Sequence, residues 1–368
     1  MVLQRYKLLN FFSLCMGVIF CSLVVQLGMD QSAQADDKLK ADCRAKLEKA
    51  RLWIRATDFK APEEEKIRVR SAIDATNITC SAAMASSPSD GEVLVNAAYA
   101  LFAAGDKKEG MKLIEQASKT GYPPAMVMVA RYMGQGKYIE KDSEGAWLLL
   151  IRVLKTKHSS ARIQAALEFL PGGVGPENVK RTKTVLRELI NNENGEAMVT
   201  YAMKVLKLQD AKVGSEKAKE GIELLERAAS KAKNPKALIF LSLLYNQGNM
   251  VKRNKEKAIE YAQLAIDSKI PRAFGTMGQI YQNQGDNESA VEWFRKGAAI
   301  GDGFSQGMLG FMYSGGFGVA QDLGEAVEWW TKGRWNGDKM ASSYLRVHRD
   351  REQAKKIWEE SQKEEVKK

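Results

Sequence analysis

Few side chains in this sequence have the types and spacing that catalysis or metal binding requires. The chain of 368 residues holds only two histidines, His158 and His348. A hydrolytic triad would need one of them near a nucleophile and an acid, and no such set is visible in the sequence. His158 follows a Lys-Thr-Lys segment at a predicted helix end, where a basic side chain suits the helix dipole. The Cys and His spacing of metal ligands is also missing, so we expect no catalytic residue, no metal and no cofactor.

A glycine-rich stretch, Pro171–Asn178, invites comparison with phosphate-binding loops. Such a loop ends in Gly-Lys followed by Ser or Thr, or it follows a strand, and neither feature is present here. We therefore predict that these glycines form a turn between two helices.

The placement of the cysteines indicates one covalent cross-link. Of the four cysteines, Cys15 and Cys21 fall in an apolar N-terminal segment. The remaining two, Cys43 and Cys80, are an even pair in a chain that we expect to be exported, which favours a disulfide. Two free buried thiols are the alternative.

The N-terminus has the layout of a bacterial export signal. Arg5 and Lys7 precede an uncharged, mostly apolar run over 8–27, and Ala-Gln-Ala at 33–35 fits a cleavage site. We expect cleavage of residues 1–35, no stable membrane span afterwards, and a periplasmic or secreted location. An uncleaved membrane anchor is the alternative, because the apolar run approaches the length that spans a bilayer.

Residues 36–90 are expected to form an N-terminal helical hairpin. The pattern predicts helices over 37–57 and 62–85 with a turn at 58–61, and a proline followed by three glutamates suits the first turn of the second helix. Counting outward from the turn places Cys43 and Cys80 within about one helical turn of each other. A disulfide across the hairpin is therefore feasible.

Beyond the hairpin the sequence is repetitive. Small residues that open a helix recur at spacings of 32, 36, 36, 40, 36 and 32. These anchors are Val93, Ala125, Ala161, Ala197, Ala237, Ala273 and Ser305. The anchor and the positions four and eight residues after it form one stripe of a helix, and the position five residues after it is small, which lets a neighbouring helix approach closely. A second amphipathic helix follows each first helix.

The repeats define the fold class. Antiparallel helix pairs in succession, without a strand of period-two alternation, predict an all-α protein, an α-solenoid that follows the helical hairpin. We assign about seven units to residues 91–340. A further anchor, Ala341, begins a capping helix and charged tail over 341–368, because Arg346 and Arg349 put polar residues on the face that is buried in the other units.

The unit at 309–333 resembles the Sel1-like repeat, a relative of the tetratricopeptide repeat. The family pattern is Leu-Gly-x-x-Tyr, then Gly-x-Gly-Val-x-x-Asp, then Ala and paired aromatics. Its residues here are Leu309, Gly310, Tyr313, Gly316, Gly318, Val319, Asp322, Ala326, Trp329 and Trp330. The resemblance extends over roughly 91–345 and is weakest in the units that begin at Ala161 and Ala197. It implies a superhelix that binds other proteins, and exported bacterial members are implied to act as adaptors.

Local signals within this unit predict its turns. Gly315 and Gly316 can adopt the left-handed conformation that ends a helix. Asp322 suits the N-cap of the second helix, with Glu325 three residues later, as in a capping box. The paired tryptophans are expected mostly to fill the core between repeats.

The predicted binding surface is the concave face of the solenoid, formed by the first helices. If the stripe defined above is buried, the positions three and six residues after each anchor point to that face. The predicted binding residues are Asn96, Tyr99, Met128, Arg131, Gln164, Thr200, Met203, Phe240, Gln279, Met308 and Phe311. Methionine and aromatic side chains make adaptable contact surfaces. The alternative is that the apolar members of this set belong to the core.

The charge pattern bears on the partner. The net charge is +11, but Lys and Glu are interspersed along the helical segments, as on solvated helix faces. Basic residues interleaved with aromatics, as in nucleic-acid readers, are not seen, so we expect no nucleic-acid partner. The sequence favours a non-enzymatic exported adaptor or scaffold for a protein or peptide, in envelope assembly, signalling or host interaction. A factor that binds cell-wall glycan or exopolysaccharide is the alternative, and an enzyme is third.

Overall fold

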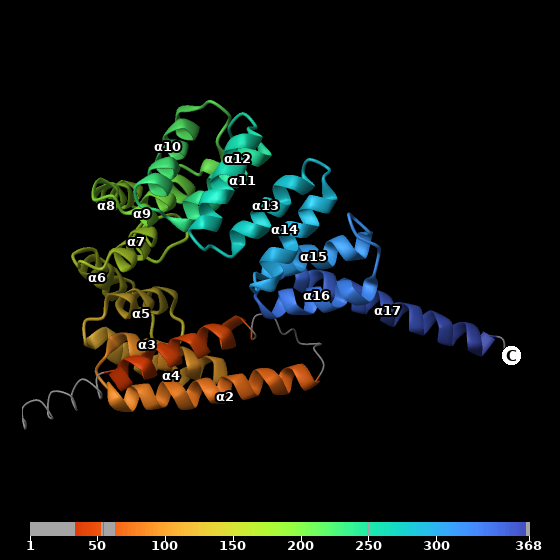
Figure 1. The fold of residues 1–368 in the computed structure, drawn as a ribbon. Coiled ribbons are helices and arrows are strands. Elements are labelled where there is room, and N and C mark those ends of the chain that lie inside the picture. Colours follow the sequence, from red (N-terminus) through yellow and green to blue (C-terminus); the bar gives the residue numbers. More distant parts are fainter. Residues whose placement is uncertain (1–33, 53, 55–62, 249, 366–368) are drawn as a thin grey trace, which may run out of the picture. The chain divides into compact units, whose positions relative to one another are not determined.

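The computed structural model describes residues 34–52, 54, 63–248 and 250–365, and every regular element within these ranges is a helix (Figure 1). The predicted all-α class is confirmed. Most of the predicted export signal and the whole predicted hairpin turn at 58–61 lie outside the described residues. The last two positions of that signal, 34 and 35, begin the first helix, which covers 34–52.

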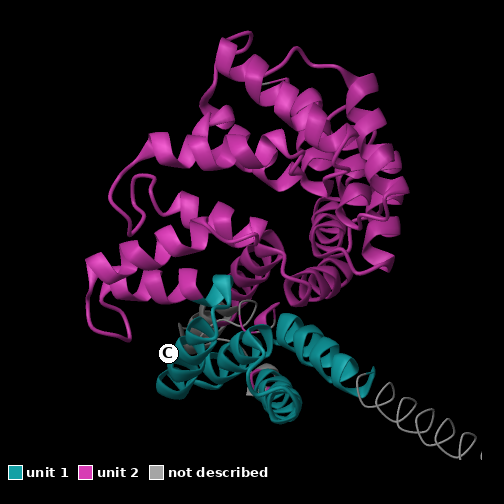
Figure 2. Ribbon diagram, turned by 90° about the vertical axis from the view of Figure 1, so that its left-hand side faces the viewer, with its two compact units in different colours: residues 1–50, 67–125 teal, residues 51–66, 126–368 magenta. Residues whose placement is uncertain are grey.

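The chain divides into two compact units (Figure 2). One consists of Met1–Ala50 and Ile67–Ala125, and we call it the N-terminal unit. The other consists of Arg51–Lys66 and Met126–Lys368, and we call it the repeat unit. The N-terminal unit therefore contains the first repeat-like helix pair together with most of the hairpin.

A disulfide joins the two helices of the N-terminal hairpin. The helix over 34–52 packs against α2 (Glu63–Ser86), and the disulfide that was predicted between Cys43 and Cys80 links them, with the two Cα atoms 4.8 Å apart. Both cysteines are buried. The cross-link encloses a sequence separation of 37 residues, which includes the segment of the predicted turn.

Ion pairs connect the hairpin to α3 (Gly91–Ala104), which is followed by α4 (Lys107–Lys119). The Lys40 ammonium lies 3.0 Å from the carboxylate of Asp90, and Arg44 pairs with Glu92. Asp90 is also the N-cap of α3, because its carboxylate accepts hydrogen bonds from the backbone N–H groups of Glu92 and Val93. The Asp90 carboxylate therefore caps α3 and also pairs it with the helix over 34–52.

In the repeat unit each helix packs mainly against its neighbours along the chain, as expected for a solenoid. One hydrophobic cluster runs from Ile163 to Ile280, and a second surrounds Leu309. The helices are α5 (Pro123–Gln135), α6 (Ser143–Leu154), α7 (Ser159–Leu167), α8 (Val179–Asn191), α9 (Gly195–Thr200), α10 (Glu216–Ser230), α11 (Pro235–Gln247), α12 (Lys255–Asp267), α13 (Arg272–Gln282), α14 (Asn287–Ala299), α15 (Gly303–Gly315), α16 (Leu323–Trp335) and α17 (Lys339–Glu365).

The predicted buried stripe is confirmed for the anchors and for the positions four residues after them, and the small residues five positions after the anchors are buried as well. All seven anchors are buried, from Val93 at 2% exposure to Ser305 at 0%. The small residues five positions later are buried against aromatic rings in two units, where Gly278 faces Phe294 and Gly310 faces Trp330. The position eight residues after the anchor is less uniform, since Phe169 is buried and Tyr313 is half-buried.

The turn between α15 and α16 follows the prediction in most details. Gly316 and Gly318 have φ values of 69° and 68°, in the left-handed region that favours glycine. Gly315 is different from the prediction, because it is still the last residue of α15. Asp322 is the N-cap of α16 and accepts a hydrogen bond of 3.0 Å from the backbone N–H of Glu325.

The reciprocal half of the predicted capping box is wrong. The backbone N–H of Asp322 donates to the carbonyl oxygen of Tyr313, and the Glu325 carboxylate instead accepts from the indole N–H of Trp329 at 3.0 Å. Trp329 is half-buried, with the Lys332 ammonium 4.2 Å from its ring centroid, while Trp330 is 5% exposed. Only the second tryptophan of the pair is fully in the core.

The interpretation of His158 as a basic residue at a helix C-terminus is wrong. It is the N-cap of α7, and its Nδ1 accepts a hydrogen bond of 3.2 Å from the backbone N–H of Ala161. The glycine-rich stretch Pro171–Asn178 connects α7 to α8, as predicted, and Asn178 is the N-cap of α8.

Candidate functional site

The residues predicted on the first helices are mostly half-buried, as expected for side chains at the edge of a core. Arg131 and Gln164 are exposed, and Met308 is buried, with 8% exposure. Asn96 and Tyr99 belong to α3 in the N-terminal unit, so they are considered apart from the rest. The half-buried members of the set are Asn96, Tyr99, Met128, Thr200, Met203, Phe240, Gln279 and Phe311.

Arg131 is part of a contact between successive units. Its guanidinium donates a hydrogen bond of 2.9 Å to the carboxylate of Glu168, which is 7% exposed. The same carboxylate accepts from the backbone N–H of Val174, in the turn after α7. A buried carboxylate that loses its cation is costly, so Arg131 has a structural role whether or not it also contacts a partner. Glu168 was not predicted because no local signal in the sequence marks a buried acid at that position.

Phe311 and Met308 lie in the C-terminal part of the repeat unit. Met308 packs in the cluster around Leu309. Phe311 contacts two further rings, with centroid distances of 5.4 Å to Phe317 and 5.9 Å to Tyr344. Phe311 therefore links an exposed ring, Phe317, to the half-buried ring of Tyr344.

Three of the predicted binding residues come together in one pocket of about 340 Å³, which we call the first-helix pocket. These are Thr200, Met203 and Phe240, from consecutive first helices. The full lining is Leu167, Val199, Thr200, Met203, Lys204, Gln209 and Phe240. Leu167 satisfies the same rule, six residues after its anchor, and it could have been predicted on that basis.

An irregular segment of the chain forms one side of the first-helix pocket. After α9 the chain makes a π-helical turn over Tyr201–Val205 and a short 3-10 helix over Leu208–Asp210. Lys207, between them, has a φ of 50°, which is uncommon for a residue with a side chain. π-turns within helices occur often at functional sites. The spacing of 40 residues between Ala197 and Ala237, the longest in the repeat array, was the signal for this irregularity.

The chemistry of the first-helix pocket suits binding. Leu167, Val199, Met203 and Phe240 contribute apolar side chains to its lining, and Thr200, Lys204 and Gln209 contribute polar groups. No carboxylate or imidazole lines it, so its side chains offer no conventional acid and base pair. In the described part of the chain, no group of three His, Cys, Asp or Glu residues is placed to hold a metal ion.

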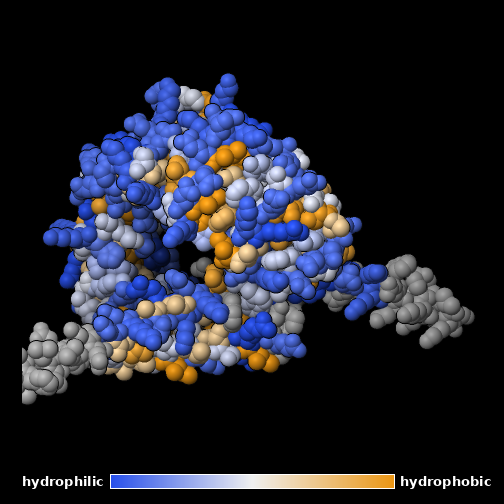
Figure 3. Space-filling model, in the orientation of Figure 1, coloured by the Kyte–Doolittle hydropathy of each residue, from blue (hydrophilic) through white to orange (hydrophobic). Residues whose placement is uncertain are grey.

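Two further observations concern the hydropathy of the surface and the apolar character of the described helices. Over the described residues, the face seen in Figure 3 is mainly hydrophilic with small apolar patches, which fits the interpretation of the interspersed Lys and Glu as solvated helix faces. None of the described helices combines the length and the apolar character that a membrane crossing requires.

Family comparisons agree with the repeat architecture. The Sel1 repeat matches residues 123–152, 235–269 and 304–333, and the tetratricopeptide repeat matches 271–300. Each matched range contains a first helix and most or all of the second helix that follows it. The chain contains Sel1 repeats and a tetratricopeptide-like repeat, as its sequence pattern indicated.

Curated relatives are similar to parts of this chain. The "DAP3-binding cell death enhancer 1" of Rattus norvegicus is 32% identical over 102 residues, which cover 27% of this chain and 20% of that protein. The "Chitin synthase regulator SKT5" of Saccharomyces cerevisiae is 25% identical over 275 residues, which cover 70% of this chain and 39% of that protein. The chain thus spans well under half of the length of either relative.

Two solved structures of bacterial proteins are among those similar to this chain. A Sel1 repeat protein from Oxalobacter formigenes has a TM-score of 0.44 and 19% identity, covering 87% of this chain and 89% of that one. The antigen c5321 of uropathogenic Escherichia coli has a TM-score of 0.42 and 16% identity, covering 81% and 79%.

Proposed function

We propose that this protein is a non-catalytic adaptor that holds a segment of a protein partner against the first helices of its repeats. The observation that carries the proposal is the first-helix pocket, where Thr200, Met203 and Phe240 from successive units line one cavity of about 340 Å³. An apolar cavity with a few polar groups in its lining accepts an anchoring side chain and orients the backbone next to it.

The names of the relatives support a role in regulation through binding. One is described as binding DAP3 and another as a regulator of chitin synthase. These descriptions belong to longer proteins, of which the chain covers 20% and 39%. The proposal takes from these descriptions only the general property that a repeat array of this kind recognises another protein.

The location that we propose is outside the cytoplasm, in the periplasm or secreted, with a role in envelope assembly, signalling or host interaction. The charged start, apolar run and Ala-Gln-Ala motif of residues 1–35 support export. The buried Cys43–Cys80 disulfide is compatible with it, because disulfides persist in oxidising compartments.

Site-specific photo-crosslinking tests the adaptor proposal. A photoreactive phenylalanine analogue placed at Phe240 in the pocket, in the native cells, is expected to capture one dominant protein. The matched control is the same analogue at Leu264 on α12, an exposed apolar position outside the pocket lining. Capture of the same protein equally well from both positions, or no capture at all, would contradict the proposal. Retention on isolated peptidoglycan without a captured protein would support the glycan alternative.

Purified partner then gives the quantitative test. Phe240→Ala removes an aromatic wall of the pocket and is expected to weaken binding about ten-fold or more, the effect of an interface hot spot. Leu264→Ala is expected to leave the affinity unchanged. Equal affinities for the Phe240→Ala variant and the parent protein would rule out the first-helix pocket as the binding site.

A further inference from the structure

A second and larger pocket of the repeat unit, of about 490 Å³, lies at the turns between first and second helices, and we call it the turn pocket. It is formed by the turn before α10, the first residues of α10, the end of α11, the turn after it and the start of α12. Its lining residues are Val213, Gly214, Ala218, Lys219, Ile222, Tyr245, Met250, Val251, Lys252, Arg253, Asn254 and Lys257. None of them lines the first-helix pocket.

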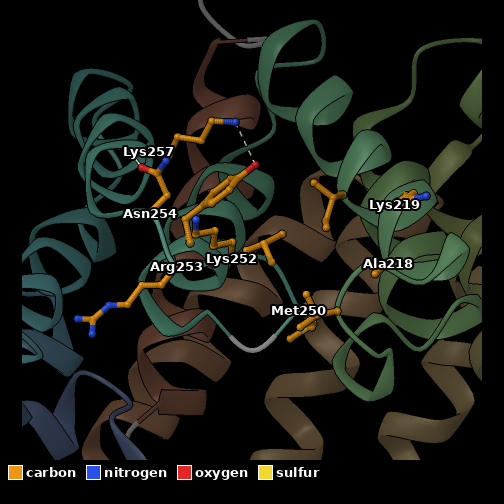
Figure 4. A pocket seen from close by; sticks show the side chains of 12 residues that line it. Ala218, Lys219, Met250, Lys252, Arg253, Asn254 and Lys257 are labelled. Carbon is orange, nitrogen blue, oxygen red and sulfur yellow. Dashed lines mark hydrogen bonds between the residues drawn. The ribbon is translucent and has the colours of Figure 1, made fainter.

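The turn pocket combines an apolar floor with cations at its sides. Figure 4 shows Met250 at the bottom, with Lys219 on one side and Lys257 on the other. Ile222 and Val251 add to the apolar lining, and no carboxylate is part of it. An occupant that is both apolar and negatively charged therefore fits its chemistry.

The cationic side chains of the turn pocket differ in whether they already have a hydrogen-bond or ion-pair partner. Lys219 lies 2.9 Å from Glu216, a pair on the exposed surface of α10. Lys252 makes no hydrogen bond or ion pair with any residue that the structure describes. Arg253 extends away from the pocket in Figure 4 and donates to the carbonyl oxygen of Asn283. Lys252 and Lys257 are therefore the cations available to a ligand.

A network of phenols holds Lys257 in place. Its ammonium donates a hydrogen bond of 3.2 Å to the hydroxyl of Tyr245, which donates to the Glu226 carboxylate at 3.1 Å. The Tyr245 ring stacks on Tyr261, with centroids 5.9 Å apart. The hydrogen bond to Tyr245 raises the pKa of Lys257, so the group is charged at neutral pH. An ammonium has three N–H donors, and two of them are left for a ligand.

We propose that the turn pocket binds a segment of the partner protein in which an apolar side chain stands next to a carboxylate. The apolar side chain packs on Met250 and Ile222, and the carboxylate lies between Lys252 and Lys257. This inference rests on the proposed adaptor function and adds a second contact, with a stated sequence preference, to the first-helix pocket. Charge complementarity selects this occupant over a neutral or basic segment.

Methyl NMR of the chain, labelled at Met and Ile methyl groups, tests the proposal with two blocked tetrapeptides, acetyl-Gly-Leu-Asp-Gly-amide and its Asn counterpart. The Asp peptide is expected to shift the signals of Met250 and Ile222, and to bind about five-fold more tightly than the Asn peptide, the effect of one exposed charge pair. The Lys252→Gln variant is expected to lose that difference. Lys217→Gln, an exposed lysine of α10 outside the pocket lining, is the matched control and is expected to keep it.

Each other outcome overturns the proposal. Equal affinities for the Asp and Asn peptides would show that the cations do not select the ligand. No shift at Met250 with either peptide would exclude the site, and a shift with decanoate alone would assign the pocket to a small amphiphile. Because Lys252 has no partner among the described residues, its substitution is not expected to disturb the fold, and the signal of the buried Ile280 checks this. Failure of crosslinking at Phe240 would contradict the adaptor function while leaving the peptide result at Met250 unaffected.

Discussion

At the scale of single residues, the small side chain five positions into each unit decides how closely the two helices of a pair approach. Gly310 shows this best, because a Cβ atom added there would lie 2.5 Å from Cδ1 of Trp330. The neighbouring backbone is also close, with the carbonyl oxygen of Ala326 at 2.9 Å. Neither neighbour is the flexible end of a long side chain, so α15 and α16 must move apart.

Gly310→Ala is therefore expected to destabilise the protein by about 1–3 kcal/mol through overpacking, measured by urea unfolding. Gly324→Ala is the matched control, since its added methyl group meets only the Asp322 carboxylate at 3.2 Å, in the first turn of α16. Removing a glycine from a helix favours folding by roughly 0.5–1 kcal/mol, so this control is expected to be neutral or slightly stabilising. A Gly310→Ala protein as stable as the parent would refute the close-approach argument.

The N-cap role of His158 leads to a second prediction at this scale. His158→Ala removes the side-chain acceptor for the N–H of Ala161 and is expected to cost about 1 kcal/mol. His158→Asn restores an acceptor at the N-cap and is expected to recover most of that loss, because Asn is among the best N-cap residues. Thermal unfolding of both variants checks the pair. Equal losses would mean that His158 stabilises the protein through another contact.

At the scale of elements, periodicity predicted the helices, and the irregular segment that forms the first-helix pocket was not predicted. Anchors such as Ala237 and Ala273 define buried stripes because a helix repeats its faces regularly. The long spacing between Ala197 and Ala237 indicates that the chain is irregular there, but it does not predict the π-turn at Tyr201–Val205 or the left-handed Lys207, since tertiary packing and not local preference selects them. Thr200, Met203 and Phe240 were identified by phase alone, whereas Gln209 depends on the irregular path of the chain.

The junction between the helix over 34–52 and α3 is expected to weaken in acid. Burial alone would raise the pKa of Asp90, but the hydrogen bonds from Lys40 and from the N–H groups of Val93 and Glu92 outweigh it, and the pKa lies below the ordinary 3.8. An acid with a lowered pKa contributes stability that is complete above its ordinary pKa and is lost as the pH falls through the folded-state pKa. The contribution of a partly exposed pair is about 1 kcal/mol or less.

Asp90→Asn tests this junction, because Asn keeps an N-cap acceptor and removes the charge that pairs with Lys40. The free energy of unfolding of the parent protein is expected to fall more steeply than that of the variant between about pH 4 and pH 2. Urea unfolding at a series of pH values measures both slopes. Parallel slopes would show that Asp90 does not contribute to the acid sensitivity.

At the scale of the whole molecule, contacts run mainly between elements that are adjacent in the chain, so a local change is expected to have a local effect. The Cys43–Cys80 disulfide is the sharpest case, because it closes a sequence separation of 37 residues within the N-terminal hairpin. A cross-link over such a loop limits the freedom of the unfolded chain, and its loss typically costs about 2–4 kcal/mol.

Reduction of this disulfide is therefore expected to speed amide hydrogen exchange in the helix over 34–52 and in α2, while α13 to α16 keep their protection. A Cys43→Ser, Cys80→Ser double variant is expected to show the same pattern without reductant and no further change with it. Faster exchange in α15 and α16 of the reduced protein would show that the solenoid unfolds as one cooperative body. Contacts between adjacent helices alone would then not account for its stability. If the change is confined to the hairpin, the first helices that form the proposed binding surface keep their structure when the disulfide is lost.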